Sequence, residues 1–133
     1  MTTYDARIVN AEGVPPVIDD DVLIRRTITG LTAGQYITTA WFTVKQRYKQ
    51  TDEEALLQLE ITTAPSLAGQ ITDNGDGKVT GEVEFWVHDE DYANLLPDKV
   101  YVYDVQLLLS DGTIATLEVG EVEWTPQVTR ARS

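Results

Sequence analysis

KVYVYDVQLLL, residues 99–109, is the stretch that decides the fold. It has the length of one long strand, and its residues alternate between two sets. Successive side chains of a strand point to opposite faces, so one set can line a core: Tyr101, Tyr103, Val105, Leu107 and Leu109. Asp111-Gly112 follows at once, and glycine tolerates the positive φ that tight hairpin turns need. We therefore predict a central hairpin of Lys99–Leu109 and Thr113–Val119, with the other strands packed on or beside it.

Strand patterns recur along the rest of the chain, in runs rich in β-branched and aromatic residues. The predicted strands are Tyr4–Asn10, Val22–Ile28, Tyr36–Tyr48, Leu59–Thr63, Lys78–Val87, and a last segment that is either two strands, Thr113–Val119 and Glu121–Trp124, or one strand bent at Gly120. In the second of these, Arg26 interrupts an apolar face. In the third, the predicted core face is Tyr36, Ala40, Phe42, Val44 and Tyr48. In Lys78–Val87 the valines and Phe85 face the core, and the side chains expected to face water are Thr80, Glu82, Glu84 and Trp86.

Two short stretches break the strand pattern. Thr51 with Glu54 is a capping-box signature, in which the threonine hydroxyl caps an orphan amide and the glutamate reaches back to the threonine amide. We predict one or two helical turns within Thr51–Gln58. His88–Leu96 is predicted to be a short helical turn, because its acidic residues at 89–91 suit the positive end of a helix.

Seven or eight strands with turn signals at regular spacing, plus two short helical insertions, predict an all-β fold. We expect a single antiparallel immunoglobulin-like β-sandwich. The Cys…Trp…Cys hallmark of true immunoglobulin domains is absent, because the chain has no cysteine. A length of 133 residues fits one domain. We place that domain at residues 1–127 and a basic tail at residues 128–133.

The chain is strongly acidic, with a formal net charge of −12. This balance argues against nucleic-acid binding, whose footprint is a basic patch, and against binding to anionic membranes. Residues 1–49 carry a net charge of +1, whereas residues 50–127 carry −15. Either a near-neutral docking face lies apart from an acidic solvent face, or the acids keep a small β-domain soluble. The first residues lack the blocks of a signal peptide, so we expect synthesis in the cytoplasm.

The search for a catalytic or metal site predicts no enzyme and no cofactor. Glu82 and Glu84 lie about 7 Å apart on one strand face, a spacing compatible with glycosidases, but acid–base catalysis needs a desolvated carboxyl and these are expected to be solvated. Asp73, Asn74 and Asp76 are weak candidates for calcium. If Gly77 is set at position 6 of a calcium loop, Val83 falls where a bidentate glutamate is needed. A hairpin turn is therefore the preferred prediction for this segment.

Contact residues are sought among aromatic and basic side chains, since interfaces favour aromatic and arginine anchors. Trp86 is predicted to face water, and Trp41 lies opposite the core face of its strand. Three basic residues alternate at the end of that strand, where they contact an acidic partner or pair with acids of a neighbouring strand: Lys45, Arg47 and Lys49. The tail bears Arg130 and Arg132, and it is either disordered or an arm that orders on a partner.

The C-terminal two thirds of the chain resembles a group of small structural proteins of tailed bacteriophages and, more loosely, the immunoglobulin-like N-terminal domain of phage upper baseplate proteins. The resemblance lies in the order of the following pieces: AWFTVK (residues 40–45), the acidic then apolar segment Thr51–Ile61, GQIT (69–72), the strand Val79–Val87, Leu96-Pro97, YVYDVQ (101–106), SDGT (110–113), Thr116–Gly120 and VTR (128–130). These are strand and turn elements, and none of them is catalytic.

The resemblance implies a virion component with a β-sandwich fold, which acts as an accessory docking, cement or adaptor subunit on the capsid or the tail/baseplate. The implied partners are other phage structural proteins and further copies of the chain, with a trimer common for such proteins on symmetric particles. The alternative is a carbohydrate-binding β-sandwich module. It would stack sugars on Trp41, Trp86 or Trp124 and bind calcium at Asp73–Asp76.

Overall fold

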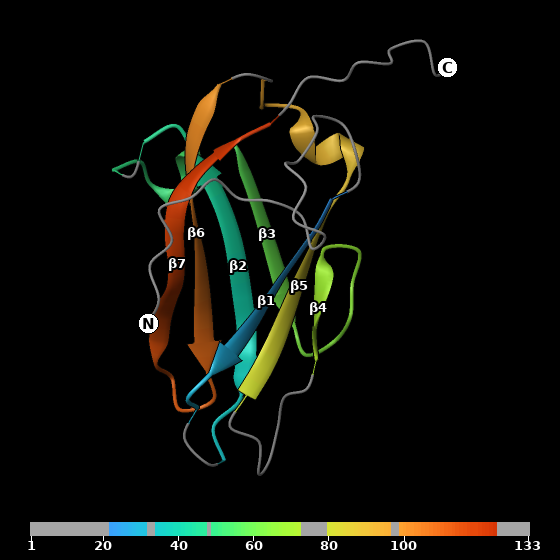
Figure 1. Ribbon diagram of the computed structural model, residues 1–133, viewed down its shortest axis with the longest axis vertical. Helices are drawn as coiled ribbons and strands as arrows, with labels where there is room; N and C mark the ends of the chain where they lie inside the picture. The colour runs from blue at the N-terminus through green and yellow to red at the C-terminus, as the bar shows by residue number, and fades with distance from the viewer. Residues whose placement is uncertain (1–21, 32–33, 48, 73–79, 97–98, 125–133) are drawn as a thin grey trace.

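A computed structural model describes residues 22–31, 34–47, 49–72, 80–96 and 99–124 (Figure 1). Within these ranges the chain forms seven strands and two short 3₁₀-helices, in the order β1 (Val22–Thr29), β2 (Ile37–Lys45), η1 (Asp52–Glu54), β3 (Leu57–Thr62), β4 (Gly69–Thr72), β5 (Thr80–Val87), η2 (Asp89–Tyr92), β6 (Val100–Leu109) and β7 (Ile114–Glu123). Both predicted helical insertions are present. The predicted strand Tyr4–Asn10, the turn at residues 73–77 and the tail at residues 128–133 lie outside the described residues.

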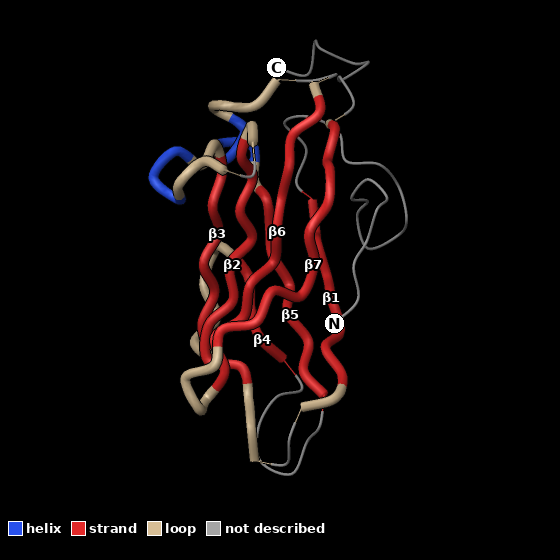
Figure 2. Tube along the Cα trace, turned by 90° about the vertical axis from the view of Figure 1, so that its left-hand side faces the viewer, coloured by secondary structure: helices blue, strands red, loops and turns tan. Residues whose placement is uncertain are grey.

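The strands form two antiparallel sheets, a smaller one with the order β1-β5-β4 and a larger one with the order β3-β2-β6-β7. The two sheets pack as layers (Figures 1 and 2), and the ring centroids of Phe42 in β2 and Phe85 in β5 lie 5.8 Å apart between them. β4 contacts β3 along one side of the molecule. On the other side, β1 is joined to β7 by an ion pair. This arrangement agrees with the predicted all-β architecture of two packed sheets.

β6 is one of the two inner strands of the larger sheet, whereas its hairpin partner β7 is an end strand, so the predicted hairpin is not central. Its five alternate residues from Tyr101 to Leu109 are all buried, and the residues between them point to the other face of the sheet. β6 pairs with β2 on one side and with β7 on the other. The turn between β6 and β7 contains Gly112 at φ 88°, and the Gly112 N–H donates to the carbonyl of Leu109 at 2.9 Å. The predicted hairpin is confirmed.

The predicted core face of β2 is right at three of its residues and wrong at its start, and Tyr48, its last residue, lies outside the described residues. Ala40, Phe42 and Val44 are buried, but Tyr36 is 37% exposed and Ile37 is buried in its place. The register between β2 and β6 shifts between Ile37 and Thr39. A β-bulge inserts one unpaired residue, and one residue is enough to exchange the two faces of a strand.

A second bulge lies in β7, which is one strand and not two. Its register against β6 shifts between Val105 and Gln106, because Glu118 pairs with Val105 whereas Thr116 pairs with Gln106. Leu117 is therefore the extra residue, and the irregularity lies there and not at Gly120. Because Val105 faces the core, its partner Glu118 also points inward between the sheets.

Each 3₁₀-helix is a single short turn within the segment predicted to be helical. At η1, the Glu54 carboxylate accepts the Thr51 N–H at 3.0 Å and the Thr51 hydroxyl at 3.2 Å, so the glutamate reaches back as predicted. The strand β3 begins at Leu57, inside the segment predicted to be helical. At η2, the Asp91 carboxylate accepts the His88 N–H at 2.8 Å. This contact confirms His88 as the start of a helical turn.

Candidate interaction surfaces

The outer face of the larger sheet, which is the side of β3-β2-β6-β7 turned away from the core, presents Trp41. The Trp41 indole N–H donates to the Glu60 carboxylate of β3 at 2.9 Å, so the ring is held in place and half-buried. Thr43, two residues further along β2, is buried although it points outward. The side-chain amide of Gln58 donates to its hydroxyl at 3.1 Å. Next to Thr43 lies a cavity of about 20 Å³, which has room for about one water molecule.

The direct neighbours of Trp41 in the ladder are polar, namely Glu60 of β3 and Gln106 of β6, and the apolar side chains of this outer face lie further along β6 and β7. Ile114 is 65% exposed and Val100 is also exposed, while Val102 and Leu108 are half-buried. Leu108 pairs with Ile114 across the β6–β7 ladder, so these two side chains form one apolar patch next to the turn. Exposed apolar surface of this kind is a feature of contact sites.

Of the three basic residues predicted at the end of β2, only Lys45 lies in the strand. β2 ends at Lys45, whose ammonium donates to the main-chain carbonyl of Gln50 at 2.9 Å. Arg47 and Lys49 lie beyond the strand and are exposed. The Gln50 side-chain carbonyl closes this segment into a turn by accepting two main-chain N–H groups, from Gln46 at 2.9 Å and from Arg47 at 3.1 Å. The strand alternation used in the prediction therefore stops before Arg47.

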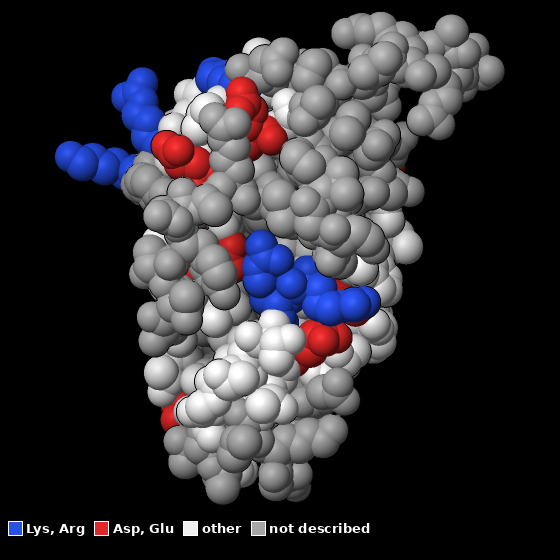
Figure 3. Space-filling model, in the orientation of Figure 1, with Lys and Arg blue, Asp and Glu red and all other residues white. Residues whose placement is uncertain are grey.

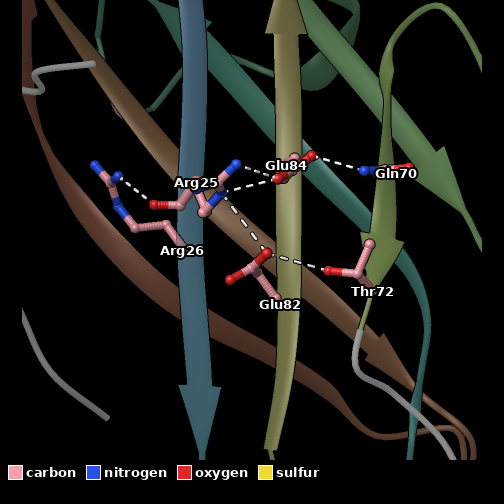
Figure 4. A network of polar contacts seen from close by, with 6 residues as sticks. All are labelled: Arg25, Arg26, Gln70, Thr72, Glu82 and Glu84. Atoms are coloured by element: carbon pink, nitrogen blue, oxygen red, sulfur yellow. Dashed lines mark hydrogen bonds and ion pairs between the residues drawn. The ribbon is translucent and has the colours of Figure 1, made fainter. Parts of the chain in front are cut away.

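The outer face of the smaller sheet carries a polar network drawn from all three of its strands (Figure 4). Arg25 of β1 donates to Glu84 of β5 through Nε at 2.8 Å, and its Nη2 lies 2.7 Å from the same carboxylate. The other oxygen of Glu84 accepts the side-chain amide of Gln70 from β4 at 2.8 Å. Next to it, Glu82 accepts the Thr72 hydroxyl at 3.1 Å and lies 3.6 Å from Arg25. Each carboxylate of β5 is thus paired on its flanking strands.

The expectation that the β5 carboxylates are solvated is wrong for Glu84, because this residue is only 6% exposed. Burial alone would raise its pKa. The hydrogen bonds from Gln70 and Arg25 and the positive charge of Arg25 outweigh that effect, so the pKa of Glu84 lies below its ordinary value. A carboxylate with this many donors is suited to remain ionised, whereas a general acid needs the opposite shift.

The tryptophans do not form one contact surface. Trp86 lies on the outer face of the smaller sheet, next to Leu23 in the β1–β5 ladder, and it is half-buried. Trp41 lies on the outer face of the larger sheet, on the other side of the molecule. Trp124 is 1% exposed and cannot stack a sugar. A docking face that combines Trp41 with Trp86 is therefore excluded, and so is a sugar platform that uses Trp124.

Inside the molecule, a polar bridge joins the two sheets. Arg26 of β1 donates to the two oxygens of the Glu118 carboxylate of β7, at 2.7 Å through Nε and at 3.2 Å through Nη2. The Tyr103 hydroxyl of β6 donates to the same carboxylate. Burial, followed by the hydrogen bond to Glu118 and its charge, raises the pKa of Tyr103 well above its ordinary value. Burial alone would lower the pKa of Arg26. The hydrogen bond to Glu118 and the charge of Glu118 outweigh burial, so the pKa of Arg26 is raised.

Sequence reasoning noticed one half of this bridge. Arg26 interrupts an apolar strand face, which is the signal of an inward-pointing charge that needs a partner. Glu118 could not be singled out, because the bulge at Leu117 turns it inward and a bulge leaves no mark in the alternation of one sequence.

An aromatic cluster closes one end of the core. The Trp124 ring meets the Tyr92 ring of η2 edge-on, with centroids 5.8 Å apart, and lies 6.4 Å from the Tyr101 ring. The Trp124 indole N–H is buried and has no hydrogen-bond partner in the part of the chain that the structure describes. The cluster fixes η2 to the sandwich through contacts between rings.

Metal and membrane sites were also sought. Among the described residues, no group of three or more His, Asp or Glu side chains is placed to hold a metal ion. The His88 ring contacts the carbonyl of Leu67 at 2.8 Å through Nε2. Neither of the described helices is long and apolar enough to cross a membrane. The calcium candidates Asp73, Asn74 and Asp76, and the tail arginines Arg130 and Arg132, lie outside the described residues.

The charges on the face seen in Figure 3 are mixed. Basic and acidic side chains lie beside one another in the middle of that view, and not in separate patches. The contacts of Arg25 with Glu82 and Glu84 account for such mixing on the outer face of the smaller sheet.

No protein-family model matches the sequence, and a search of curated proteins finds none that is detectably similar. The resemblance to phage structural proteins therefore stays a prediction.

Proposed function

We propose that this chain is a non-enzymatic accessory subunit of a bacteriophage particle, which docks on a capsid or tail/baseplate protein through the outer face of its larger sheet. The observation that carries the proposal is the outward apolar pair Leu108–Ile114. Ile114 is 65% exposed, and Leu108 lies two residues from Gln106, the β6 partner of Trp41. The sequence resemblance supplies the kind of particle. The polar network on the opposite face is internally paired, which leaves the larger sheet as the better contact surface.

We also propose that the fold is immunoglobulin-like. Immunoglobulin domains place strands B, E and D in one sheet and C, F and G in the other, with C′ added beside C in variable-type domains. The orders β1-β5-β4 and β3-β2-β6-β7 follow the same scheme. The Tyr101 hydroxyl accepts the N–H of Leu96 at 2.9 Å, which is the contact of the tyrosine corner at the start of strand F.

The buried bridge supports the same assignment. In antibody domains a disulfide joins strands B and F, and its second cysteine lies two residues after the corner tyrosine. The corresponding residue here is Tyr103, and the facing strand β1 supplies Arg26. Glu118 links the two by accepting hydrogen bonds from both. A hydrogen-bonded bridge thus joins the sheets in a chain that has no cysteine.

The test is mass spectrometry of particles purified on a density gradient from a lysate of the cells that produce the chain. We expect the chain in the particle band. Trp41→Ala should reduce its share there, whereas the matched control Trp86→Ala, on the opposite face, should not. A chain that stays in the soluble fractions would contradict the proposal. Binding of the isolated chain to a glycan array, lost in Trp41→Ala, would favour the carbohydrate-binding alternative.

A further inference from the structure

The two sides of the sandwich are held together in different ways. On one side, β3 of the larger sheet contacts β4 of the smaller one. On the other side lie β1 and β7, the end strands of the two sheets in the described fold (Figure 2), which the ion pair of Arg26 and Glu118 joins. Beyond Arg26, at the C-terminal end of β1, a cleft of about 280 Å³ opens between the sheets.

The lining of this cleft is part aliphatic and part polar. Aliphatic side chains come from all three strands that border it, namely Ile28 of β1, Leu107 and Leu109 of β6, and Leu117 of β7. Polar groups come from Thr27, Thr29 and Gln35, and no charged side chain lines the cleft among the described residues. The cleft therefore suits an uncharged group that has both apolar surface and hydrogen-bonding atoms, because buried polar groups need partners.

The edge of β1 next to the cleft can accept a further strand. β1 pairs with β5 along one edge, and no strand of the described ranges pairs with its other edge. Natural sheets pair or cover such edges, because an open edge recruits strands from other chains. An occupant that brings its own strand would both fill the cleft and extend the ladder.

The sequence before β1 supplies a strand of the right chemistry. Tyr4–Asn10 is predicted to be a strand, and its alternation places Tyr4, Ala6 and Ile8 on one face. This face is uncharged, like the lining of the cleft, whereas Asp5 and Arg7 lie on the other face. Tyrosine combines an apolar ring with a hydroxyl group, so Tyr4 matches a cleft that is aliphatic in one part and polar in the other.

The length of chain also fits. The eleven residues 11–21, which include Gly13, Pro15 and Pro16, separate Tyr4–Asn10 from β1 and are enough for a loop that reverses the chain. The strand can then run antiparallel to β1 with Asn10 beside Val22. Tyr4 is six residues from Asn10, about 20 Å along a strand, and Ile28 is six residues from Val22, so Tyr4 lies beside Ile28, where the cleft opens.

The charges tolerate this register. Arg7, on the outward face, comes to lie beside Arg25. Arg25 is paired with two carboxylates, those of Glu82 and Glu84, so these three groups carry a net charge of −1. A second guanidinium next to them balances that charge.

We propose that Tyr4–Asn10 forms an additional strand on the edge of β1, antiparallel to it, with the Tyr4 ring in the cleft. The occupant of the cleft is thus a segment of the same chain. The contact uses neither Trp41 nor the outer face of the larger sheet, so it goes beyond the docking proposed above and stands or falls independently of it.

The test is nuclear magnetic resonance of the full chain with a nitroxide spin label, which can be attached at one chosen site because the chain has no cysteine. Thr29→Cys places the label at an exposed position on the rim of the cleft. Leu67→Cys is the matched control, since Leu67 is 81% exposed on the turn between β3 and β4, on the other side of the molecule. We expect the label at residue 29, and not the label at residue 67, to broaden the amide resonances of Tyr4–Ala6. Equal broadening by both labels, or none by either, overturns the proposal.

A mixed sample distinguishes the same chain from a second copy. Spin-labelled Thr29→Cys without nitrogen-15 is mixed with unlabelled wild type that carries nitrogen-15. We expect no broadening in this mixture, because the strand and the cleft belong to one molecule. Broadening of the Tyr4–Ala6 resonances would show that a second copy supplies the strand, and would contradict the proposal.

Two neighbouring β-branched residues give an independent readout of the buried face. Ile8→Asp places a charge on the face turned toward the core and should lower the urea midpoint of unfolding. Val9→Asp makes the same change one position along, on the outward face, and should leave the midpoint almost unchanged. An equal or larger loss in Val9→Asp contradicts the proposed orientation of the strand.

Discussion

The buried bridge gives the sharpest test of how the two sheets are held together, through the substitution Arg26→Leu. Glu118 is 2% exposed, and Arg26→Leu removes the guanidinium that now contacts both of its oxygens. Removal of one partner of a buried ion pair costs about 3–5 kcal/mol, because the remaining charge is uncompensated. The free energy of unfolding of a small domain is only about 5–15 kcal/mol. We therefore expect Arg26→Leu to remove a large fraction of the free energy of unfolding.

The reverse single substitution and the double substitution complete the cycle. Glu118→Leu leaves the Tyr103 hydroxyl without its acceptor, which costs about 1–3 kcal/mol; the Arg26 side chain is 20% exposed and can turn toward water. In Arg26→Leu/Glu118→Leu, both charges are replaced by apolar groups, and such replacements are often neutral or stabilising by about 1–4 kcal/mol. We expect the double variant to be more stable than Arg26→Leu alone.

Urea unfolding followed by tryptophan fluorescence measures all four corners of this double-mutant cycle, provided that the transition is two-state. The expected coupling energy is several kcal/mol, since partners in contact are strongly non-additive. If the loss in the double variant equals the sum of the two single losses, the two side chains do not act as a unit, and the bridge as we describe it is refuted.

Three further predictions concern single residues. Gly69→Ala should destabilise the chain by more than about 4 kcal/mol, because Gly69 has φ 139° and a Cβ there would lie 1.9 Å from the main-chain oxygen of Glu84. The control Gly112→Ala, also at positive φ but with open space around it, should lose only about 1–2 kcal/mol. Equal losses of stability for the two variants in thermal unfolding would contradict this explanation. Trp124→Phe should change stability by less than about 1 kcal/mol, because it removes a buried N–H that has no described partner, whereas Trp124→Ala should cost about 3–5 kcal/mol. Similar losses of stability for the two variants in urea unfolding would refute this explanation. The pKa of Glu84 in the folded chain is lowered from its ordinary 4.5, so its contribution to stability is present above pH 4.5 and is lost as the pH falls through the folded pKa. Glu84→Gln should therefore flatten the acid side of the curve of stability against pH. An unchanged acid side would show that Glu84 is not responsible for it.

The parts of the fold that could be predicted from sequence are those that depend on unbroken alternation. The pairing of β6 with β2 is regular except at the last residues of β6, where the register shifts. All five predicted core residues of β6 are buried. The turn at Asp111-Gly112 was predictable because glycine is the residue that adopts a positive φ without strain, and Gly112 has φ 88°. In these places local chemistry and tertiary packing require the same residues.

The errors arise where one extra residue or a distant partner decides the outcome. At Ile37 and again at Leu117, a bulge shifts the alternation by one position, so a tyrosine predicted inside lies outside and Glu118 lies inside. Glu84 is buried because Arg25 and Gln70, which lie 59 and 14 positions away in the chain, meet its two oxygens. No periodicity within β5 encodes those partners. The contact surface was misjudged for a similar reason, because Trp41 and Trp86 are assigned to opposite faces only once the strands are sorted into two sheets.

The inward charges of Arg26 and Glu118 have a consequence for how chains avoid one another. β1 and β7 are the end strands of their sheets in the described fold, and strands in that position can recruit strands from other chains into aggregates. Natural sheets guard against this with inward-pointing charges and with bulges, and β7 has both while β1 has the complementary charge. A chain in which both residues are leucine would lose these inward charges, and we expect it to form aggregates through mispaired strands even where it still folds. By this argument, the bridge protects solubility as well as stability.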